Sequence, residues 1–347
     1  MYKAFLRPLL FLISPEKIHE LLVGTVKLLY RIPFAAKLLR KLFCQEHPSL
    51  GTEFMGLHFK NPVGLAAGFD KNAGFFEEFS CFGFGFIEIG TITPLPQPGN
   101  TKPRSFRLKK DKALINRMGL NNEGVDAAVQ RLKNRKPGLI IGGNIGKNTN
   151  TPNENAVDDF VYCFEKLYDH VDYFVINISC PNTGEIDKLQ DQDVMEAILT
   201  EIIKKRALKM VKKPVLLKIS PDLNFIQIDQ AISIIQKLKI DGVVATNTTV
   251  KRDNLNSPAD LIHSIGSGGL SGAPLKNRSN EVIRYIYEKT DHSLPIIGVG
   301  GIMSAQDAME KMEAGAVLIQ VYSGFIYEGP MFVKRILGSL IHSRHSI

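Results

Sequence analysis

Eight short apolar runs recur along the chain after residue 48, and each is followed by a segment with the periodicity of a helix. The runs do not alternate strictly between apolar and polar positions, which is typical of parallel strands buried on both faces. Eight strand–helix units in about 300 residues predict an α/β fold, a (β/α)8 TIM barrel. An open doubly wound sheet has the same local pattern, although no G-x-G-x-x-G motif follows the first strand. The expected strands are Val63–Ala67, Gly85–Thr93, Leu139–Gly146, Tyr173–Ser179, Pro214–Ser220, Gly242–Thr249, Pro295–Ile302 and Ala316–Ser323.

The first 47 residues have a different pattern, in which apolar stripes at helical spacing are interleaved with cations. Ser14 and Pro15 are typical of an N-cap and a first helical position, and Pro33 interrupts the stripe before it resumes. No apolar run is long enough to span a bilayer, and no signal-peptide cleavage pattern follows. We therefore expect a pair of amphipathic helices in residues 1–47 and the barrel in residues 48–347. Such helices either pack on the barrel or lie in a membrane interface.

The formal net charge of the 347-residue chain is +8, and its distribution is uneven. Residues 1–47 hold eight Lys or Arg against three Glu, which accounts for most of the excess. Neither zinc-finger spacing nor an aromatic RNP-like motif accompanies these cations, so an anionic membrane surface is favoured over nucleic acid. The four cysteines form no C-x-x-C pair and no metal-ligand spacing, which indicates a reducing compartment and predicts no metal site.

Polar residues of a restricted kind follow the predicted strands, where the active site of a TIM barrel forms. Several are Asn, whose amides suit a planar ligand that itself carries amides. Lys71 and Lys218 suit a carboxylate or a ring that accumulates negative charge. Glycines after the last two strands allow backbone N–H groups to approach a phosphate. Each residue also has an ordinary explanation, such as a buried thiol for Cys180 or a turn cap for Asn247. Their coincidence at one barrel mouth predicts a ligand site.

Four sequence blocks carry a resemblance to a known family. They are Asn61–Lys71, Ile115–Asn122, Asn177–Thr183 and Ala245–Thr249. On these motifs the chain resembles the dihydroorotate dehydrogenases over nearly its whole length, and in particular the membrane-associated, quinone-dependent class 2 enzymes. The resemblance implies an FMN-dependent TIM barrel that oxidises dihydroorotate to orotate in pyrimidine biosynthesis, with no obligate protein partner.

The resemblance also implies roles for individual residues. The flavin would contact Ala67, Gly68, Phe69, Asp70, Lys71, Thr91, Asn144, Asn177, Lys218, Thr246, Gly272, Gly301, Tyr322 and Ser323. The substrate would contact Lys71, Asn116, Arg117, Met118, Gly119, Leu120, Asn177, Asn182, Asn247 and Thr248. His19 and Arg107 would lie near a quinone tunnel beneath the N-terminal helices.

Cys180 stands where class 2 enzymes usually carry a serine base, and a cysteine there is typical of the soluble class 1 enzymes. Because class 1 enzymes lack the amphipathic extension, we interpret the chain as class 2, with Cys180 as the catalytic base and residues 1–47 as a membrane-facing entrance for quinone. This implies a peripheral protein on the cytoplasmic face of a bacterial cell membrane. Three other functions fit the residues: a class 1 enzyme that uses fumarate or an NAD-linked partner, a flavin-free phosphate-binding isomerase, and a membrane-surface binding protein on a degenerate barrel.

Overall fold

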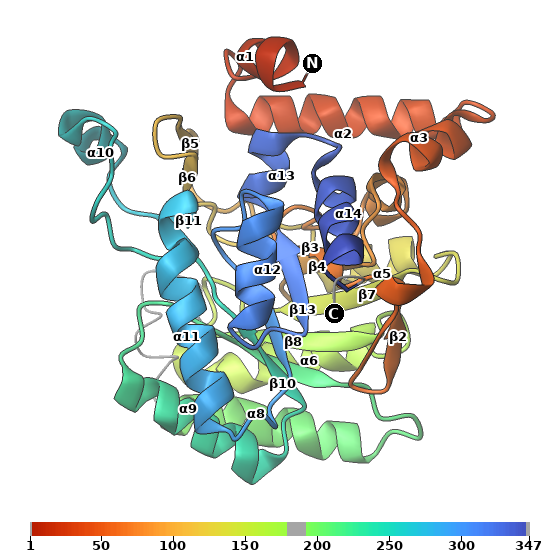
Figure 1. Cartoon of the computed structure of the whole chain (residues 1–347). Helices are drawn as coiled ribbons and strands as arrows, with labels where there is room; N and C mark the ends of the chain where they lie inside the picture. The colour runs from red at the N-terminus through yellow and green to blue at the C-terminus, as the bar shows by residue number, and fades with distance from the viewer. Residues whose placement is uncertain (1, 179–191, 345–347) are drawn as a thin grey trace.

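The computed structural model describes residues 2–178 and 192–344, and eight parallel strands within them close into a barrel (Figure 1). Each barrel strand pairs with the next one along the chain, and the last pairs with the first through Ile319 and Val63. Each predicted segment contains one of these strands, which confirms the TIM barrel and excludes the open sheet. The strands are β3 (Val63–Leu65), β4 (Phe86–Ile92), β7 (Ile140–Ile145), β8 (Tyr173–Asn177), β9 (Val215–Ile219), β10 (Gly242–Ala245), β12 (Ile296–Val299) and β13 (Leu318–Val321).

Large side chains fill the barrel interior because glycines on neighbouring strands make room for them. A Cβ atom on Gly64 would lie 2.3 Å from the ring of Phe86, and one on Gly142 would lie 2.3 Å from the ring of Tyr173. Phe59 packs against Phe86 from below, with 5.3 Å between the ring centroids. It belongs to a hairpin formed by β1 (Thr52–Phe54) and β2 (Leu57–Phe59). This packing fills the N-terminal half of the barrel and leaves ligand-sized space at the C-terminal ends of the strands.

Helices surround the barrel and bury the apolar layer on its outer face (Figure 1). Phe160 and Phe164 of α6 and Ile283 of α11 are fully buried in this layer. The described helices after residue 48 are α4 (Phe76–Phe79), α5 (Val125–Leu132), α6 (Ala156–Leu167), α8 (Gln192–Ala207), α9 (Phe225–Leu238), α10 (Ala259–Ile265), α11 (Lys276–Lys289), α12 (Ala305–Glu313), α13 (Ser323–Glu328) and α14 (Phe332–Arg344). Of these, α10 lies away from the barrel and packs Ile265 against the β5–β6–β11 strands instead. Short 3-10 turns lie at η2 (Pro48–Leu50), η3 (Ser80–Phe82), η4 (Asn153–Asn155) and η5 (Ala273–Leu275).

A small antiparallel sheet, which the sequence pattern did not predict, stands beside the barrel mouth. Its order is β11 (Gly269–Gly272), β6 (Ala113–Asn116) and β5 (Ser105–Leu108). Gly269 pairs with Asn116, so two segments about 150 residues apart in the chain meet here. The sheet positions three of the predicted site residues, Arg107, Asn116 and Gly272, at the mouth.

The N-terminal segment forms α2 (Pro15–Arg31) and α3 (Ala35–Phe43), which lie across the end of the molecule above α13 (Figure 1). The start at Pro15 and the break around Pro33 confirm the predicted helix pair. Ser14 occupies the N-cap position, but its side chain makes no capping hydrogen bond. A π-helix, η1 (Tyr2–Leu6), and a short α1 (Arg7–Leu10) precede the pair and were not predicted. Within residues 2–178 and 192–344, no helix has the length and apolar character needed to span a membrane.

Candidate active site

One cavity of about 780 Å³ lies at the C-terminal ends of the barrel strands and continues beneath the N-terminal helices. Leu10 of α1 and Ile18 and Val23 of α2 line its outer part. Most residues singled out from the sequence lie around this cavity. They are Ala67, Gly68, Phe69, Asp70, Lys71, Thr91, Asn177, Lys218, Thr246, Gly272, Gly301, Tyr322 and Ser323 of the flavin set, Asn116, Met118, Leu120, Asn247 and Thr248 of the substrate set, and His19 and Arg107 of the quinone set.

Three of the predicted residues do not line the cavity. Asn144 is fully buried in β7, beneath the cavity floor. Arg117 turns away, because it donates to the carbonyl of Pro103 at 3.3 Å and stacks on the ring of Phe106 at 4.7 Å. Gly119 has a φ of 69°, and its carbonyl accepts from Gln97 Nε2 at 3.1 Å. Cys180 and Asn182 lie outside the described residues.

A polar network in the barrel interior underlies the cavity, and its centre is Glu88, which the sequence analysis did not single out. The Glu88 carboxylate is fully buried. It accepts hydrogen bonds from Asn144 Nδ2 at 2.7 Å and from Gln320 Nε2 at 2.6 Å. Lys218 Nζ lies 3.5 Å from the same carboxylate. Glu88 thus ties β4 to β7, β9 and β13. The available sequence signal was a carboxylate within the otherwise apolar run Phe86–Ile92.

The network continues upward from Asn144 to the cavity wall. Thr91 donates its hydroxyl to Asn144 Oδ1 at 2.6 Å and accepts from Asn177 Nδ2 at 2.9 Å. Asn247 Nδ2 then donates to Asn177 Oδ1 at 3.3 Å. Because each side chain in this series is hydrogen-bonded to the next, the amide groups at the mouth are held in one orientation before any ligand binds.

The loop after β3 presents Lys71 to the cavity. Its geometry is set by Asp70, whose buried carboxylate accepts from the backbone N–H groups of Gly74 at 2.7 Å and Phe75 at 2.9 Å. Lys71 Nζ donates to the carbonyl of Gly68 at 2.8 Å. Burial lowers the pKa of Lys71 to about 8. A carboxylate placed beside this lysine would favour its charged form.

Glycines and hydroxyls gather at another side of the cavity. Gly272, Gly300 and Gly301 all have positive φ, at 104°, 115° and 78°. Nearby, the hydroxyls of Ser271 and Ser323 lie 2.8 Å apart, and Ser323 begins α13. Ser271 is not predicted from the sequence, whereas Gly300 is one of the glycines expected after the last two barrel strands. This is the position where the loops after the last two barrel strands bind phosphate in TIM barrels.

Helix α2 closes over the mouth through aromatic and apolar contacts. The His19 ring packs edge-on against Phe69 and Phe75, at 4.9 and 5.7 Å between centroids. Burial lowers the pKa of His19 to about 4, with a further contribution from Lys71, so this imidazole is neutral at pH 7. Arg107 lies 4.5 Å above the Phe11 ring and donates to the carbonyl of Ile13 at 2.6 Å.

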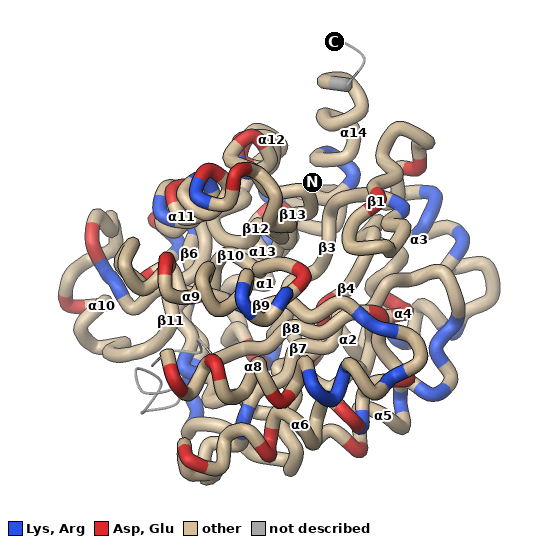
Figure 2. Tube along the Cα trace, turned by 90° about the horizontal axis from the view of Figure 1, so that it is seen from below, with Lys and Arg blue, Asp and Glu red and all other residues tan. Residues whose placement is uncertain are grey.

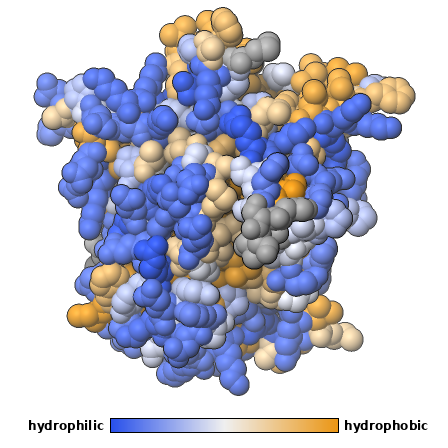
Figure 3. All heavy atoms as spheres, viewed as in Figure 1, coloured by the Kyte–Doolittle hydropathy of each residue, from blue (hydrophilic) through white to orange (hydrophobic). Residues whose placement is uncertain are grey.

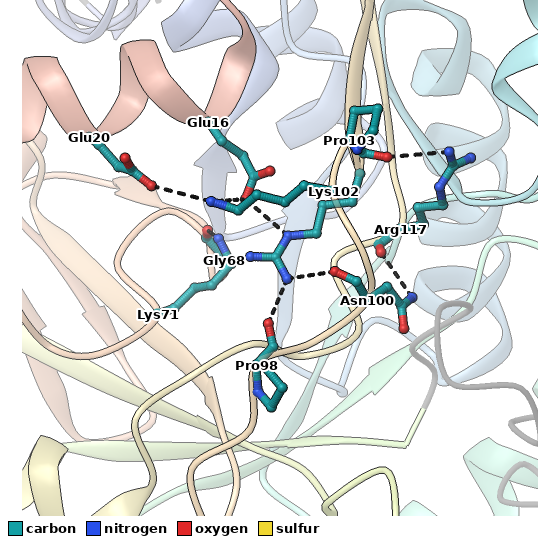
Figure 4. A network of polar contacts seen from close by, with 10 residues as sticks. Glu16, Glu20, Gly68, Lys71, Pro98, Asn100, Lys102, Pro103 and Arg117 are labelled. Carbon is teal, nitrogen blue, oxygen red and sulfur yellow. Dashed lines mark hydrogen bonds and ion pairs between the residues drawn. The ribbon is translucent and has the colours of Figure 1, made fainter.

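A salt bridge fastens α2 to the mouth (Figure 4). Arg104 Nε lies 3.0 Å from Glu16 Oε1, and its side chain is almost completely buried. Arg104 also donates to the carbonyls of Pro98 at 2.6 Å and Asn100 at 2.9 Å. Lys102 Nζ lies 3.8 Å from Oε1 of Glu20, which also belongs to α2. The N-terminal helix is therefore held to the barrel by charged contacts beside Lys71.

The comparisons with known proteins agree over nearly the whole chain. The family model described as dihydroorotate dehydrogenase matches residues 49–343. The dihydroorotate dehydrogenase (quinone) of Christiangramia forsetii is 54% identical over 336 residues, which is 97% of each chain. That of Gloeobacter violaceus is 48% identical, over 96% of this chain and 92% of its own. The ligand-free DHODH structure from Eimeria tenella superposes with a TM-score of 0.83 at 34% identity, over 95% of this chain and 94% of its own. The chain belongs to the dihydroorotate dehydrogenase family.

Proposed function

We propose that the protein oxidises dihydroorotate to orotate at a bound FMN and passes the electrons to a membrane quinone, as a step of pyrimidine biosynthesis. The observation that supports this most strongly is the shape of the cavity. It joins the polar strand ends, where Lys71 and Lys218 lie, to an apolar space under α2. A polar substrate and an apolar electron acceptor could therefore reach the same cofactor from different directions.

The residues around the inner cavity fit FMN. Gly68 has a φ of 91°, and a Cβ atom there would extend into the cavity, with Tyr322 at 3.6 Å as its nearest neighbour. Thr246 Oγ1 is buried and has no hydrogen-bond partner among the described residues, so it can bond to a ligand. Lys218 supplies positive charge for a ring that becomes anionic on reduction. Gly272 and Gly301 bring backbone close to the expected phosphate position.

A bound FMN would supply the electron chemistry, as acceptor of a hydride from dihydroorotate and donor of electrons to a quinone. The protein's own residues bind, orient and deprotonate the substrate. Lys71 pairs with the substrate carboxylate, and Asn116, Asn177 and Asn247 orient the amide groups of the ring. Cys180 takes the proton from C5, since a thiol with an ordinary pKa of about 8.5 is a far better base than a serine hydroxyl near neutral pH.

We assign residues 1–47 to quinone access and membrane binding. Their apolar side chains face solvent to an unusual extent: Leu12 is 80% exposed and Phe34 is 85% exposed. Figure 3 shows hydrophobic residues gathered over the N-terminal helices at the top of the molecule. Lys and Arg lie along α3 beside them (Figure 2). Exposed Leu and Phe with adjacent cations favour an anionic bilayer surface, as expected for a peripheral protein on the cytoplasmic face of a bacterial cell membrane.

A flavin spectrum of the purified protein tests the reaction. The protein should be yellow, and dihydroorotate should bleach the flavin absorbance in the absence of oxygen. Subsequent addition of quinone should restore the colour, whereas fumarate or NAD⁺ should not. Folded protein without flavin absorbance after incubation with FMN would favour a flavin-free barrel. Faster reoxidation by fumarate or NAD⁺ would favour a class 1 reaction.

Two matched substitutions test the membrane assignment. Phe34→Glu places a charge on the N-terminal helices, and Leu208→Glu places one at a similarly exposed apolar site, 82% exposed, after α8. Phe34→Glu should weaken binding to anionic liposomes and turnover with a long-chain quinone, whereas Leu208→Glu should change neither. Raised salt should also weaken liposome binding, because exposed charges are screened. Equal effects of the two substitutions would contradict the assignment.

A further inference from the structure

Lys311 is a fully buried lysine that takes no part in the proposed chemistry. It belongs to α12, on the outer side of the barrel. Its aliphatic stem lies against β12 at Gly298, where an added Cβ atom would come within 2.8 Å of Lys311 Cγ. The strand therefore carries a glycine at the point where the lysine side chain passes it. Lysine is almost never fully buried unless its ammonium group is paired, so a specific arrangement at its tip is expected.

The tip of Lys311 is bonded to the neighbouring helix. Its Nζ donates to Ser279 Oγ at 2.9 Å and to Asn280 Oδ1 at 2.6 Å, both on α11. Ser279 in turn donates its hydroxyl to the carbonyl of Val299 at 2.8 Å. The same carbonyl accepts from the backbone N–H of Thr246 at 2.8 Å. Two successive side-chain hydrogen bonds thus connect α12, through α11, to the last residue of β12.

The turn that follows Val299 is shaped by the first residues of α11. A Cβ atom on Gly301 would lie 2.2 Å from Lys276 Cα, and one on Gly300 would lie 3.2 Å from Ser279 Cβ. The turn is therefore in direct contact with the helix that Lys311 holds. A displacement of α11 would move the backbone of Gly300 and Gly301, which lines the cavity.

We infer that Lys311 is a positioning residue for the phosphate end of the flavin site: through Ser279 it holds α11 and the Gly300–Gly301 turn in the shape that receives the phosphate of FMN. This inference rests on the proposed function and adds to it a residue that never touches the cofactor. It predicts an effect confined to the phosphate, because the ring and substrate contacts come from other strands.

The surroundings of Lys311 allow this role in either protonation state. Burial is the main cause that lowers the pKa of Lys311 to about 7; Asp307 opposes this shift and Lys276 adds to it. A neutral amine still carries two N–H groups, which match the two acceptors on Ser279 and Asn280.

The test compares FMN with riboflavin, which lacks the phosphate. Full-length protein is purified with its flavin, and a second sample is exchanged into riboflavin. Flavin release after dilution is followed by fluorescence, and equilibrium binding is titrated for each ligand. Lys311→Met should weaken the binding of FMN by about tenfold, which is the equivalent of one net hydrogen bond. It should weaken the binding of riboflavin by less than about twofold.

A lysine at the opposite end of the barrel provides the matched control. Lys213 is half-buried before β9, where its Nζ donates to the carbonyl of Val171 at 2.6 Å. Lys213→Met should leave the ratio of FMN to riboflavin affinity unchanged. If Lys311→Met does not fold, Ser279→Ala removes the hydroxyl that links the lysine to Val299 and should lower the same ratio.

Equal weakening of both flavins, or no change in the ratio for a folded Lys311→Met or Ser279→Ala protein, would overturn the inference. Failure of the wild-type protein to bind either flavin would instead overturn the proposed function. The two failures are therefore distinguishable.

Discussion

Removing the charge of Glu88 should cost more stability than removing the charges of Glu88 and Lys218 together. Both side chains are buried, with exposed fractions of 0% and 7%, and 3.5 Å separates the Lys218 nitrogen from the carboxylate. In Glu88→Gln, the introduced amide keeps an oxygen for Asn144. Its N–H groups would face Gln320 Nε2, which is also a donor, so the Gln320 amide must turn over and accept through Oε1, an atom that is buried without a partner among the described residues. The substitution therefore changes the charge while leaving the hydrogen bonds and the volume largely intact.

The geometry sets the size of the effect. Two unit charges at this distance attract by about 5 kcal/mol at an effective dielectric constant of 20. Desolvation offsets part of this attraction, and removal of one partner from buried pairs costs about 3–5 kcal/mol. Glu88→Gln should therefore lower the free energy of unfolding by about 3 kcal/mol. Adding Lys218→Met should recover part of that loss, because the cation is no longer buried beside a neutral group.

The assay is urea unfolding of the four proteins of this double-mutant cycle, followed by circular dichroism. Asp229→Asn is the control: Lys289 lies 3.0 Å from Asp229, but the pair is exposed, so its loss should matter far less. The reasoning is refuted if the effects of Glu88→Gln and Lys218→Met add to within about 0.5 kcal/mol. The reasoning would also be refuted if Asp229→Asn lowered the free energy of unfolding as much as Glu88→Gln, because burial would then not determine the loss of stability.

Two further predictions concern the reaction. Because Lys71 has its pKa lowered to about 8, it loses its proton as the pH rises through that value. The KM for dihydroorotate should therefore rise above pH 8, and a Lys71→Gln protein should show a high KM without this rise; an unchanged profile would remove Lys71 from carboxylate binding. Cys180→Ala should slow anaerobic flavin reduction by about a hundred- to ten-thousand-fold in stopped flow while FMN stays bound, and Cys180→Ser should retain more activity than alanine. Reduction of the alanine variant at the wild-type rate would show that another group is the base.

The barrel and much of the mouth could be predicted from the sequence because they depend on local patterns. Eight apolar runs located the eight strands, since a parallel strand buried on both faces is a continuous apolar segment. Residues at the ends of those runs or just past them, such as Lys218 and Lys71, were expected at one mouth because parallel barrel strands end on the same face. The start of α2 at Pro15 also follows from a local preference, because a proline at the first helical position lacks only a hydrogen bond that is not formed there.

The remaining features depend on contacts between distant segments, which only the tertiary structure decided. The sheet that carries Asn116 pairs it with Gly269, and no local periodicity announces such a pairing. Arg117 is adjacent to Asn116, yet its contacts turn it away from the cavity. Glu88 became the centre of the interior network because three other strands bring donors to it. An isolated carboxylate in an apolar run has no partner that the sequence can name, and a buried charge is tolerated only where the fold supplies one.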